Sequence, residues 1–223
     1  NDTTGSGSGA AYLFYGTSTI FSGSITLSNA NAKFTGEAED DRAGRSVACA
    51  GDVNNDGYDD FLIGAYFCNA TGTHAGAAYL FYGTTTVFSG SITLSTANAR
   101  FLGEESSNLA GISVASARNL NGDSYDDFLI GANLNDATGT DSGAAYLFYG
   151  TTTVFYGSIP LYHANAKFVG VGGGDEAGGL AAGTGGVRAR LATTRDLDPF
   201  GVHARGTRGV HHRKGHGVAS GVL

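Results

Sequence analysis

Two stretches of the sequence place side-chain oxygens at alternating positions, an arrangement that can surround a metal ion. The first covers residues 52–60 and reads DVNNDGYDD, and the second covers residues 119–127 and reads NLNGDSYDD. Carboxylate, amide and carbonyl oxygens at alternate positions of a tight loop turn toward one centre, and this all-oxygen set is what Ca²⁺ prefers, whereas Mg²⁺ retains its waters. The candidate ligands are Asp52, Asn54, Asp56, Tyr58 (carbonyl) and Asp60 in the first loop, and Asn119, Asn121, Asp123, Tyr125 (carbonyl) and Asp127 in the second.

The two loops differ in ligand charge and in backbone freedom. The first has three carboxylates at ligand positions, whereas the second has two, because an Asn replaces the first Asp. Gly57 can adopt a positive φ with little strain, whereas a positive φ at its counterpart Ser124 would be more strained. We therefore predict a complete calcium site in the first loop and a weaker one in the second. Asp59 and Asp126 are expected to point away from the ion and to contribute field or hydrogen bonds.

Other loops with a similar start fit less well. An EF-hand needs Glu at loop position 12 and a helix on either side. Position 12 here is Ile63, inside the apolar run 61–65 (FLIGA), and a dockerin-type loop fails for the same reason. Clusters of Asp, Asn and Gly also form ordinary turns, which remains an alternative. The complete spacing and its recurrence favour a calcium site between two strands.

The loops recur because the sequence repeats with a period of 67 residues. YLFYG begins at Tyr12, Tyr79 and Tyr146, and FLIGA begins at Phe61 and Phe128. A fixed long period is typical of an array in which each unit buries its apolar face against the next. The units are residues 1–67, residues 68–134 and a truncated unit, residues 135–178.

Each unit has the pattern of four short strands. In the unit 44–101 we expect strands at residues 45–50, 61–65 and 77–83, and residues 91–94, with or without 98–102, complete a fourth. The 37 Gly residues and the absence of Met and Trp give little support for helices. The predicted fold is all-β, a β-propeller built from four-stranded blades of 67 residues. About three blades are present, and a closed ring takes about 4–8, so we expect a partial ring and a fragment of a longer array.

Charge limits the classes of partner. Residues 1–170 carry six Lys and Arg against sixteen Asp and Glu, a net charge of −10. This suits hard cations and argues against nucleic-acid binding, which needs a basic surface. No run approaches the roughly 18 apolar residues of a membrane-spanning helix, so we expect no membrane insertion within this segment.

The repeat pattern stops after Gly178. The period places a third acidic loop at residues 186–194, but that stretch reads GVRARLATT and has no carboxylate. Residues 179–223 are either a genuine basic extension or the product of a reading-frame error near Gly179, and the abrupt loss of register favours the error. A disordered segment is a third description of this tail. We assign no function to its His residues.

Cys49 and Cys68 are the two cysteines of the chain, and both lie in one unit. Their counterparts one period later are Ser116 and Asn135. Cysteines that appear together suggest a pair, and a disulfide would fit an oxidising compartment. Two unrelated thiols remain an equal alternative.

The run AGRSVACAGDVNNDGYDDFLIGA, followed by GAAYLFYG, resembles the FG-GAP repeat, the blade of the integrin α-subunit head. The resemblance covers residues 1–178 and implies that the first loop binds calcium through the ligands named above. The Phe-Gly of the family is here Ala43-Gly44, Ala110-Gly111 and Ala177-Gly178, so the aromatic residue is missing. The near-identity of the units looks more like a bacterial array than an animal integrin.

The resemblance implies a calcium-stiffened propeller used for extracellular adhesion or ligand binding, at the cell surface or outside the cell. The expected partner is a protein or carbohydrate ligand on the loops at the top of the blades. No nucleophile or base stands apart from the repeat, so we expect a non-catalytic module. The alternatives are an accessory propeller of a secreted hydrolase, with a phospholipase D-like architecture, and a structural repeat of the cell surface.

Overall fold

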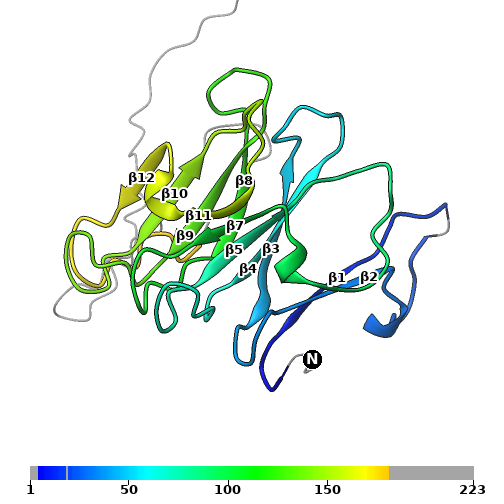
Figure 1. Cartoon of the computed structure of the whole chain (residues 1–223), viewed down its shortest axis with the longest axis horizontal. Helices are drawn as coiled ribbons and strands as arrows, with labels where there is room; N and C mark the ends of the chain where they lie inside the picture. The colour runs from blue at the N-terminus through cyan, green and yellow to red at the C-terminus, as the bar shows by residue number, and fades with distance from the viewer. Residues whose placement is uncertain (1–4, 19, 181–223) are drawn as a thin grey trace, which may run out of the picture.

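Short strands joined by polar turns make up almost all of the regular structure (Figure 1). The protein is seen in a computed structural model that describes residues 5–18 and 20–180. The strands are β1 (Ala10–Leu13), β2 (Ala32–Thr35), β3 (Ala43–Gly51), β4 (Asp60–Ala65), β5 (Ala77–Phe81), β6 (Gly90–Thr93), β7 (Ala99–Leu102), β8 (Ser113–Arg118), β9 (Asp127–Ala132), β10 (Ala144–Phe148), β11 (Gly157–Pro160) and β12 (Ala166–Val169). One-turn 3₁₀ helices, η1 (Leu27–Asn29), η2 (Leu94–Thr96) and η3 (Leu161–His163), stand before β2, β7 and β12.

The strands form three sheets that recur with the 67-residue period, and the second and third sheets each cross a boundary between the units given above. The strand orders are β1-β2-β6, β11-β7-β5-β4-β3 and β12-β10-β9-β8. The second and third sheets each contain four antiparallel strands in the sequence order of one unit, β3-β4-β5-β7 and β8-β9-β10-β12. The all-β, blade-like architecture predicted from the sequence is confirmed, and the described residues do not form a closed barrel.

The segment before the last strand of each unit pairs differently from our prediction. Residues 90–93 do not complete the sheet of their own unit. They form β6, which pairs in parallel with β2 of the preceding unit, and β11 pairs in the same way with β7. The fourth strand of the blade is instead β7 (Figure 1). β6 and β11 therefore each extend the sheet that precedes their own along the chain.

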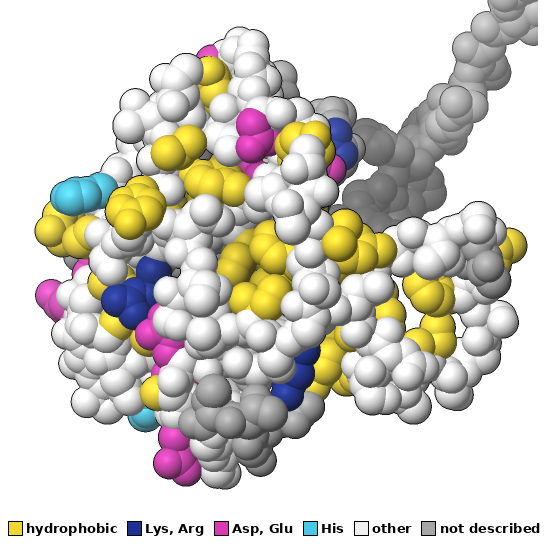
Figure 2. Space-filling view, turned by 45° about the vertical axis from the view of Figure 1, so that its right-hand side comes forward, with side chains coloured by type: hydrophobic (Ala, Val, Ile, Leu, Met, Phe, Trp, Pro, Cys, Tyr) yellow, Lys and Arg dark blue, Asp and Glu magenta, His cyan; other side chains and the backbone are white. Residues whose placement is uncertain are grey.

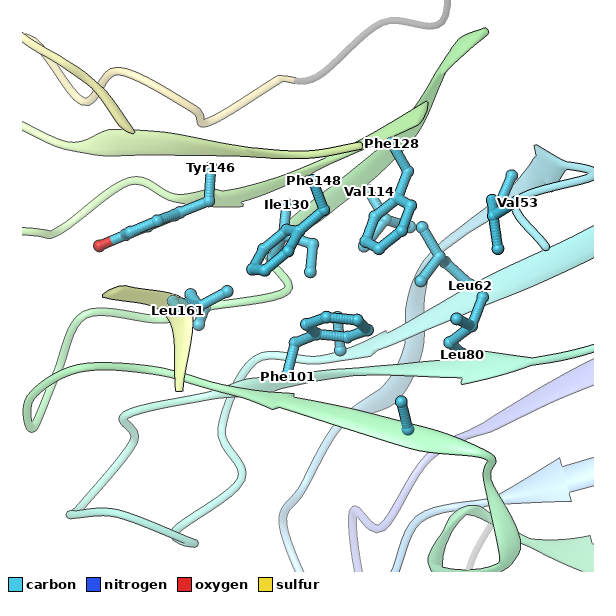
Figure 3. Close-up of a cluster of buried hydrophobic side chains, with 14 of the residues drawn as sticks. Val53, Leu62, Leu80, Phe101, Val114, Phe128, Ile130, Tyr146, Phe148 and Leu161 are labelled. Carbon is cyan, nitrogen blue, oxygen red and sulfur yellow. The ribbon is translucent and has the colours of Figure 1, made fainter. Parts of the chain in front are cut away.

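Aromatic side chains hold successive sheets together in a repeating pattern. Phe101 of β7 contacts the pair Phe128 and Phe148 of the third sheet, which are stacked at 5.4 Å with 12° between the ring planes. One period earlier, Phe34 of β2 contacts an equivalent pair at 5.3 Å and 9°. Figure 3 shows the cluster between the second and third sheets, with side chains from both sheets pointing toward one another. The core thus lies between blades.

Gly64 explains how closely the blades approach. A Cβ atom on this residue would overlap the carbonyl oxygen of Gly111 in the next blade, and a Cβ on Gly131 would overlap that of Gly178. The Oγ of Ser46 donates to the same Gly111 carbonyl at 2.8 Å. The Gly of FLIGA is therefore required by the neighbouring backbone, which a larger side chain would push away.

The two cysteines are not bonded to each other. Cys49 is exposed on β3, whereas Cys68 is buried with its Sγ 3.6 Å from the Tyr79 hydroxyl. The disulfide alternative is therefore wrong for this structure. Among the described residues, no helix is long and apolar enough to cross a membrane. The interpretations of the tail concern residues 179–223, of which 181–223 lie outside the described residues.

Candidate metal-binding loops

Each acidic loop joins the first two strands of a complete blade, β3 to β4 and β8 to β9. Asn55 and Gly57 have positive φ values of 57° and 90° in the first loop. In the second loop the corresponding values are 82° for Gly122 and 114° for Ser124. The prediction that Gly57 takes a positive φ is confirmed. Because a Cβ disfavours this region, Ser124 is held in a strained conformation.

The side chains of the first loop hold its own backbone. The carboxylate of Asp52 accepts the N–H groups of Asp56 at 3.0 Å and Gly57 at 2.8 Å. Asn54 Oδ1 accepts the same Asp56 N–H at 3.1 Å, and Asp56 Oδ1 accepts the N–H of Tyr58 at 2.9 Å. A carboxylate offers about four lone-pair sites, so these bonds leave acceptor capacity for a cation.

Asp60 connects the loop to the chain that follows β5 at the same end of the sheet. It is 1% exposed. Its Oδ2 accepts the N–H of Val53 at 2.9 Å, and its Oδ1 accepts the N–H of Gly83, just after β5, at 2.8 Å. Burial raises the pKa of Asp60 to about 7 against the opposing effect of these two N–H groups, and the charges of Asp56 and Asp52 raise it further. A cation beside this carboxylate would offset the cost of ionising it.

The second loop repeats this connection. Asp127 is fully buried, and its oxygens accept the N–H groups of Leu120 at 2.7 Å and Gly150 at 3.0 Å. Burial raises the pKa of Asp127 as well. Asn119 Oδ1 accepts the N–H of Asp123 at 2.9 Å, although it has an amide where the first loop has a carboxylate. The fixed geometry of the loop therefore survives the loss of one charge.

The central pair of ligand candidates is also arranged alike in the two loops. Asn54 Nδ2 donates to Asp56 Oδ2 at 2.9 Å, and Asn121 Nδ2 donates to Asp123 Oδ2 at 2.7 Å. Asp123 Oδ1 accepts the N–H of Tyr125 at 2.8 Å. The structure thus places all ten sequence-predicted residues in two equivalent loops, five in each.

The donor chemistry of the loops fits calcium. Within the described part of the chain, no group of three Asp, Glu, His or Cys side chains is placed to hold a metal ion. The carboxylates of Asp52 and Asp56 accept backbone N–H groups of their own loop. The donors are nonetheless exclusively hard oxygens, and each set includes a buried carboxylate whose charge its surroundings disfavour. Asp52, Asp56 and Asp60, with the Asn54 amide and the Tyr58 carbonyl, would hold the ion in the first loop.

Asp126 joins the two loops across the blade junction. Its Oδ2 accepts the N–H of Asp52 at 3.1 Å, and its own N–H donates to the Asp52 carbonyl at 3.0 Å. Close by, the N–H of Thr151 donates to the Val53 carbonyl at 3.0 Å. The expectation that Asp126 forms hydrogen bonds is confirmed, and its partner is the neighbouring loop.

Sequence reasoning missed the backbone donors that fix the buried carboxylates. The N–H groups of Gly83 and Gly150 lie 23 residues beyond Asp60 and Asp127, and backbone donors have no sequence signature. It also missed two equivalent ion pairs between successive units, Arg100 with Glu37 at 2.9 Å and Lys167 with Glu104 at 2.7 Å. The 67-residue period relates the two copies of each contact, but it does not identify which residues are partners.

Comparison with known families agrees with this geometry. The sequence model of the FG-GAP repeat matches residues 43–81 and 110–148. Each match covers three strands of one blade, β3 to β5 and β8 to β10, and includes one acidic loop. A search among curated proteins found no match.

Proposed function

Because this chain is an FG-GAP repeat protein, with blades of the integrin-like β-propeller type, we propose that its two acidic loops bind calcium and that it is a non-catalytic adhesion or ligand-binding module. FG-GAP repeats usually occur in extracellular proteins, and propellers of this kind are typically non-catalytic. We accordingly propose a location outside the cell or at its surface. The observation that carries the calcium proposal is the buried carboxylate in each loop, Asp60 and Asp127, within a set of oxygen donors.

Calcium would act structurally in this module. A bound ion supplies positive charge that offsets the repulsion among the carboxylates of one loop. Two hydrogen bonds would extend the ordering of the loop to its surroundings. Asp60 joins the loop to the end of β5 through the N–H of Gly83, and Asp126 joins it to the next blade through the N–H of Asp52. Binding that favours the folded state stabilises it by mass action.

The proposed ligand is a protein or carbohydrate that contacts the loops at this end of the blades. Tyr58 and Leu120 lie in the two loops with 41% and 43% of their surfaces exposed. Aromatic and aliphatic side chains on ordered loops are suited to recognition, because little entropy is lost when a rigid surface binds. Calcium would thus prepare the recognition surface without taking part in a reaction.

Thermal melting with calcium and with EGTA tests the calcium proposal. At a calcium concentration of 100 times Kd, the folded state gains about 2.7 kcal/mol, so the melting temperature should rise with millimolar calcium and fall with EGTA. Asp60→Ala should remove most of this increment, and Asp127→Ala should remove less.

The increment, rather than the absolute melting temperature, is compared between variants, since Asp60→Ala also removes two hydrogen bonds. Asp59→Asn is the matched control because it lies in the same loop outside the ligand positions, and it should retain the full increment. An unchanged melting temperature on adding EGTA to the calcium-loaded wild-type chain would contradict the proposal.

A further inference from the structure

The two acidic loops meet where the second and third sheets adjoin, and one residue of the second loop bonds both backbone groups of Asp52. Asp126 Oδ2 accepts the N–H of Asp52 at 3.1 Å, and the N–H of Asp126 donates to the Asp52 carbonyl at 3.0 Å. The Asp52 carboxylate in turn accepts the N–H groups of Asp56 and Gly57. The placement of the first candidate ligand of this loop therefore depends on where Asp126 lies.

The position of Asp126 is set by the second loop. Asp126 directly precedes Asp127, whose buried carboxylate accepts the N–H groups of Leu120 at 2.7 Å and Asn121 at 3.3 Å. The same carboxylate accepts the N–H of Gly150 at 3.0 Å. Ordering of the second loop around Asp127 thus also orders the residue that bonds Asp52.

Backbone hydrogen bonds keep the two loops beside each other. Val53 donates its N–H to Asp60 Oδ2 at 2.9 Å, and its carbonyl accepts the N–H of Thr151 at 3.0 Å. Thr151 follows Gly150, which donates to Asp127. The buried carboxylates of the two loops are therefore joined through a short chain of bonds, and Asp126 meets Asp52 at a junction that the backbone already closes.

Gly51 makes the close approach of Asp126 possible. A Cβ atom on Gly51, which has a φ of 81°, would overlap the Asp126 carboxylate. The counterpart of Gly51 one period later is Arg118, an exposed residue with a φ of 51°. Both positions adopt a positive φ, and a Cβ is absent at the position that contacts a neighbouring loop. The contact, rather than the turn alone, therefore requires the Gly.

The Asp126 carboxylate has no ion pair with a basic side chain in the part of the chain that the structure describes. The ion pairs there involve Asp40, Glu37 and Glu104 instead. Lys and Arg side chains are few on the face of the molecule that Figure 2 presents. Asp126 thus offers the first loop both a hydrogen-bond acceptor and a negative charge, two contributions that different variants can separate.

We propose that Asp126 is a positioning residue that couples the two loops, so that calcium bound in one loop raises the affinity of the other for calcium. The coupling rests on the calcium binding proposed above. A loop that holds an ion is ordered, and less conformational entropy remains to be lost when its neighbour binds. Coupling between two sites typically changes affinity by about 5–150-fold.

NMR spectra of the full chain can read the two loops separately, at the amide of Gly57 in the first and the amide of Gly122 in the second. Calcium is titrated with a chelator that sets its free concentration. The first loop fills first in the wild-type chain, since it has one more ligand carboxylate. Asp56→Ala removes one of these ligands, and the Gly57 signal shows whether the first loop stays empty. The affinity of the second loop should then fall about fivefold or more.

Three further variants define the role of Asp126. In an Asp126→Ala chain, the effect of Asp56→Ala on the second loop should fall to about twofold, the range within which independent sites add. Asp126→Asn keeps an oxygen acceptor for the Asp52 N–H, so it should retain the larger effect although it lowers the charge. Asp59→Ala is the matched control, because it removes the carboxylate at the same position of the first loop while the Asp52 amide remains bonded to Asp126.

Hydrogen exchange in EGTA tests the positioning role without any metal. The Asp52 amide should exchange about tenfold faster in Asp126→Ala than in the wild-type chain, because its acceptor is lost. Asp126→Asn should restore protection, and Asp59→Ala should leave it unchanged. Equal exchange of this amide in the wild-type and Asp126→Ala chains would remove the basis of the coupling.

The possible outcomes distinguish this coupling from calcium binding itself. Binding at neither loop would overturn both proposals. Binding at both loops, with a second-loop affinity that is unchanged or higher after Asp56→Ala, would overturn the coupling alone. An equal effect of Asp56→Ala in the wild-type and Asp126→Ala chains would exclude Asp126 as the residue that carries it.

Discussion

At the scale of the residue, the two acidic loops differ at four positions, and two of these differences bear on metal binding. Asn119 replaces the Asp at loop position 1, and Ser124 replaces the Gly at position 6 with a φ of 114°. The double change Asn119→Asp and Ser124→Gly restores a carboxylate and removes strain of about 1–3 kcal/mol. Calcium affinity of the second loop should rise about tenfold or more, measured by competition with a chelator in an Asp60→Ala background. Equal affinity before and after the change would argue against these ligand positions.

A second residue-scale difference concerns a buried carboxylate outside the loops. Asp41 is 2% exposed and accepts the N–H of Ala38 at 2.8 Å. One period later, Asn108 accepts the N–H of Glu105 in the same way at 3.2 Å. Burial raises the pKa of Asp41 above 3.8 against the opposing effect of the Ala38 N–H. The chain thus holds a charged and a neutral version of one buried acceptor.

Asp41→Asn should stabilise the fold at neutral pH and not at acidic pH. Because the carboxyl of Asp41 has a higher pKa in the folded state than in the unfolded state, the unfolded chain releases this proton first as the pH rises. The contribution of Asp41 to stability therefore falls as the pH rises from the ordinary pKa of this carboxyl toward its higher pKa in the folded state. The Asn variant has no carboxyl to ionise and should be more stable by about 0.5–2 kcal/mol at pH 7, with no gain near pH 3. Urea unfolding at both pH values measures the difference, and an equal gain at both would exclude the electrostatic cause.

At the scale of the element, the sequence analysis was wrong about the strand that pairs with the sheet of another unit. The strands β3, β4 and β5 were predicted because apolar runs bounded by turns mark a strand regardless of its partner. β6 was assigned to its own blade, but it pairs with β2, which lies in the preceding unit. An apolar pattern identifies a strand and one buried face, whereas it does not say which sheet the strand joins.

The ligand candidates were predictable for a related reason. Their spacing is local, so one tight loop brings all five together, and the structure places them there. The backbone donors that hold Asp60 and Asp127 were not predictable from one unit, because any residue except Pro carries an N–H group. Contacts between units, such as the hydrogen bond between Asp126 and Asp52, could not be predicted either, because they depend on how neighbouring blades pack.

The aromatic clusters make a prediction about the blade junctions. Phe101 is fully buried and contacts three Phe rings outside its own sheet, whereas its counterpart Phe168 is 37% exposed. Phe101→Ala should destabilise the fold by about 3–5 kcal/mol. Phe168→Ala is the matched control and should cost less than about 1 kcal/mol. Chemical denaturation measures both, and similar costs would contradict the assignment of the core to the space between blades.

At the scale of the whole molecule, the described sheets differ in how well they are covered. The five-stranded second sheet lies between the other two, whereas β1 and β12 are edge strands. Local opening is easiest where few buried contacts must be broken. Hydrogen exchange followed by mass spectrometry should therefore find the amides of β4 and β5 slowest, and those of β1 and β12 at least about tenfold faster. Uniform exchange across the three sheets would show that they open as one unit.

Because the two aromatic junctions have the same geometry, the number of repeat units can change without a new kind of contact. The stacked Phe pairs lie at 5.3 Å and 5.4 Å. A Cβ on Gly44 would overlap the carbonyl oxygen of Ala10 at the first junction, as one on Gly111 would overlap that of Ala77 at the second. A gene duplication or deletion of 67 codons, wherever its breakpoints fall, rejoins two surfaces that already fit. The number of units can therefore change by whole periods without requiring a new interface.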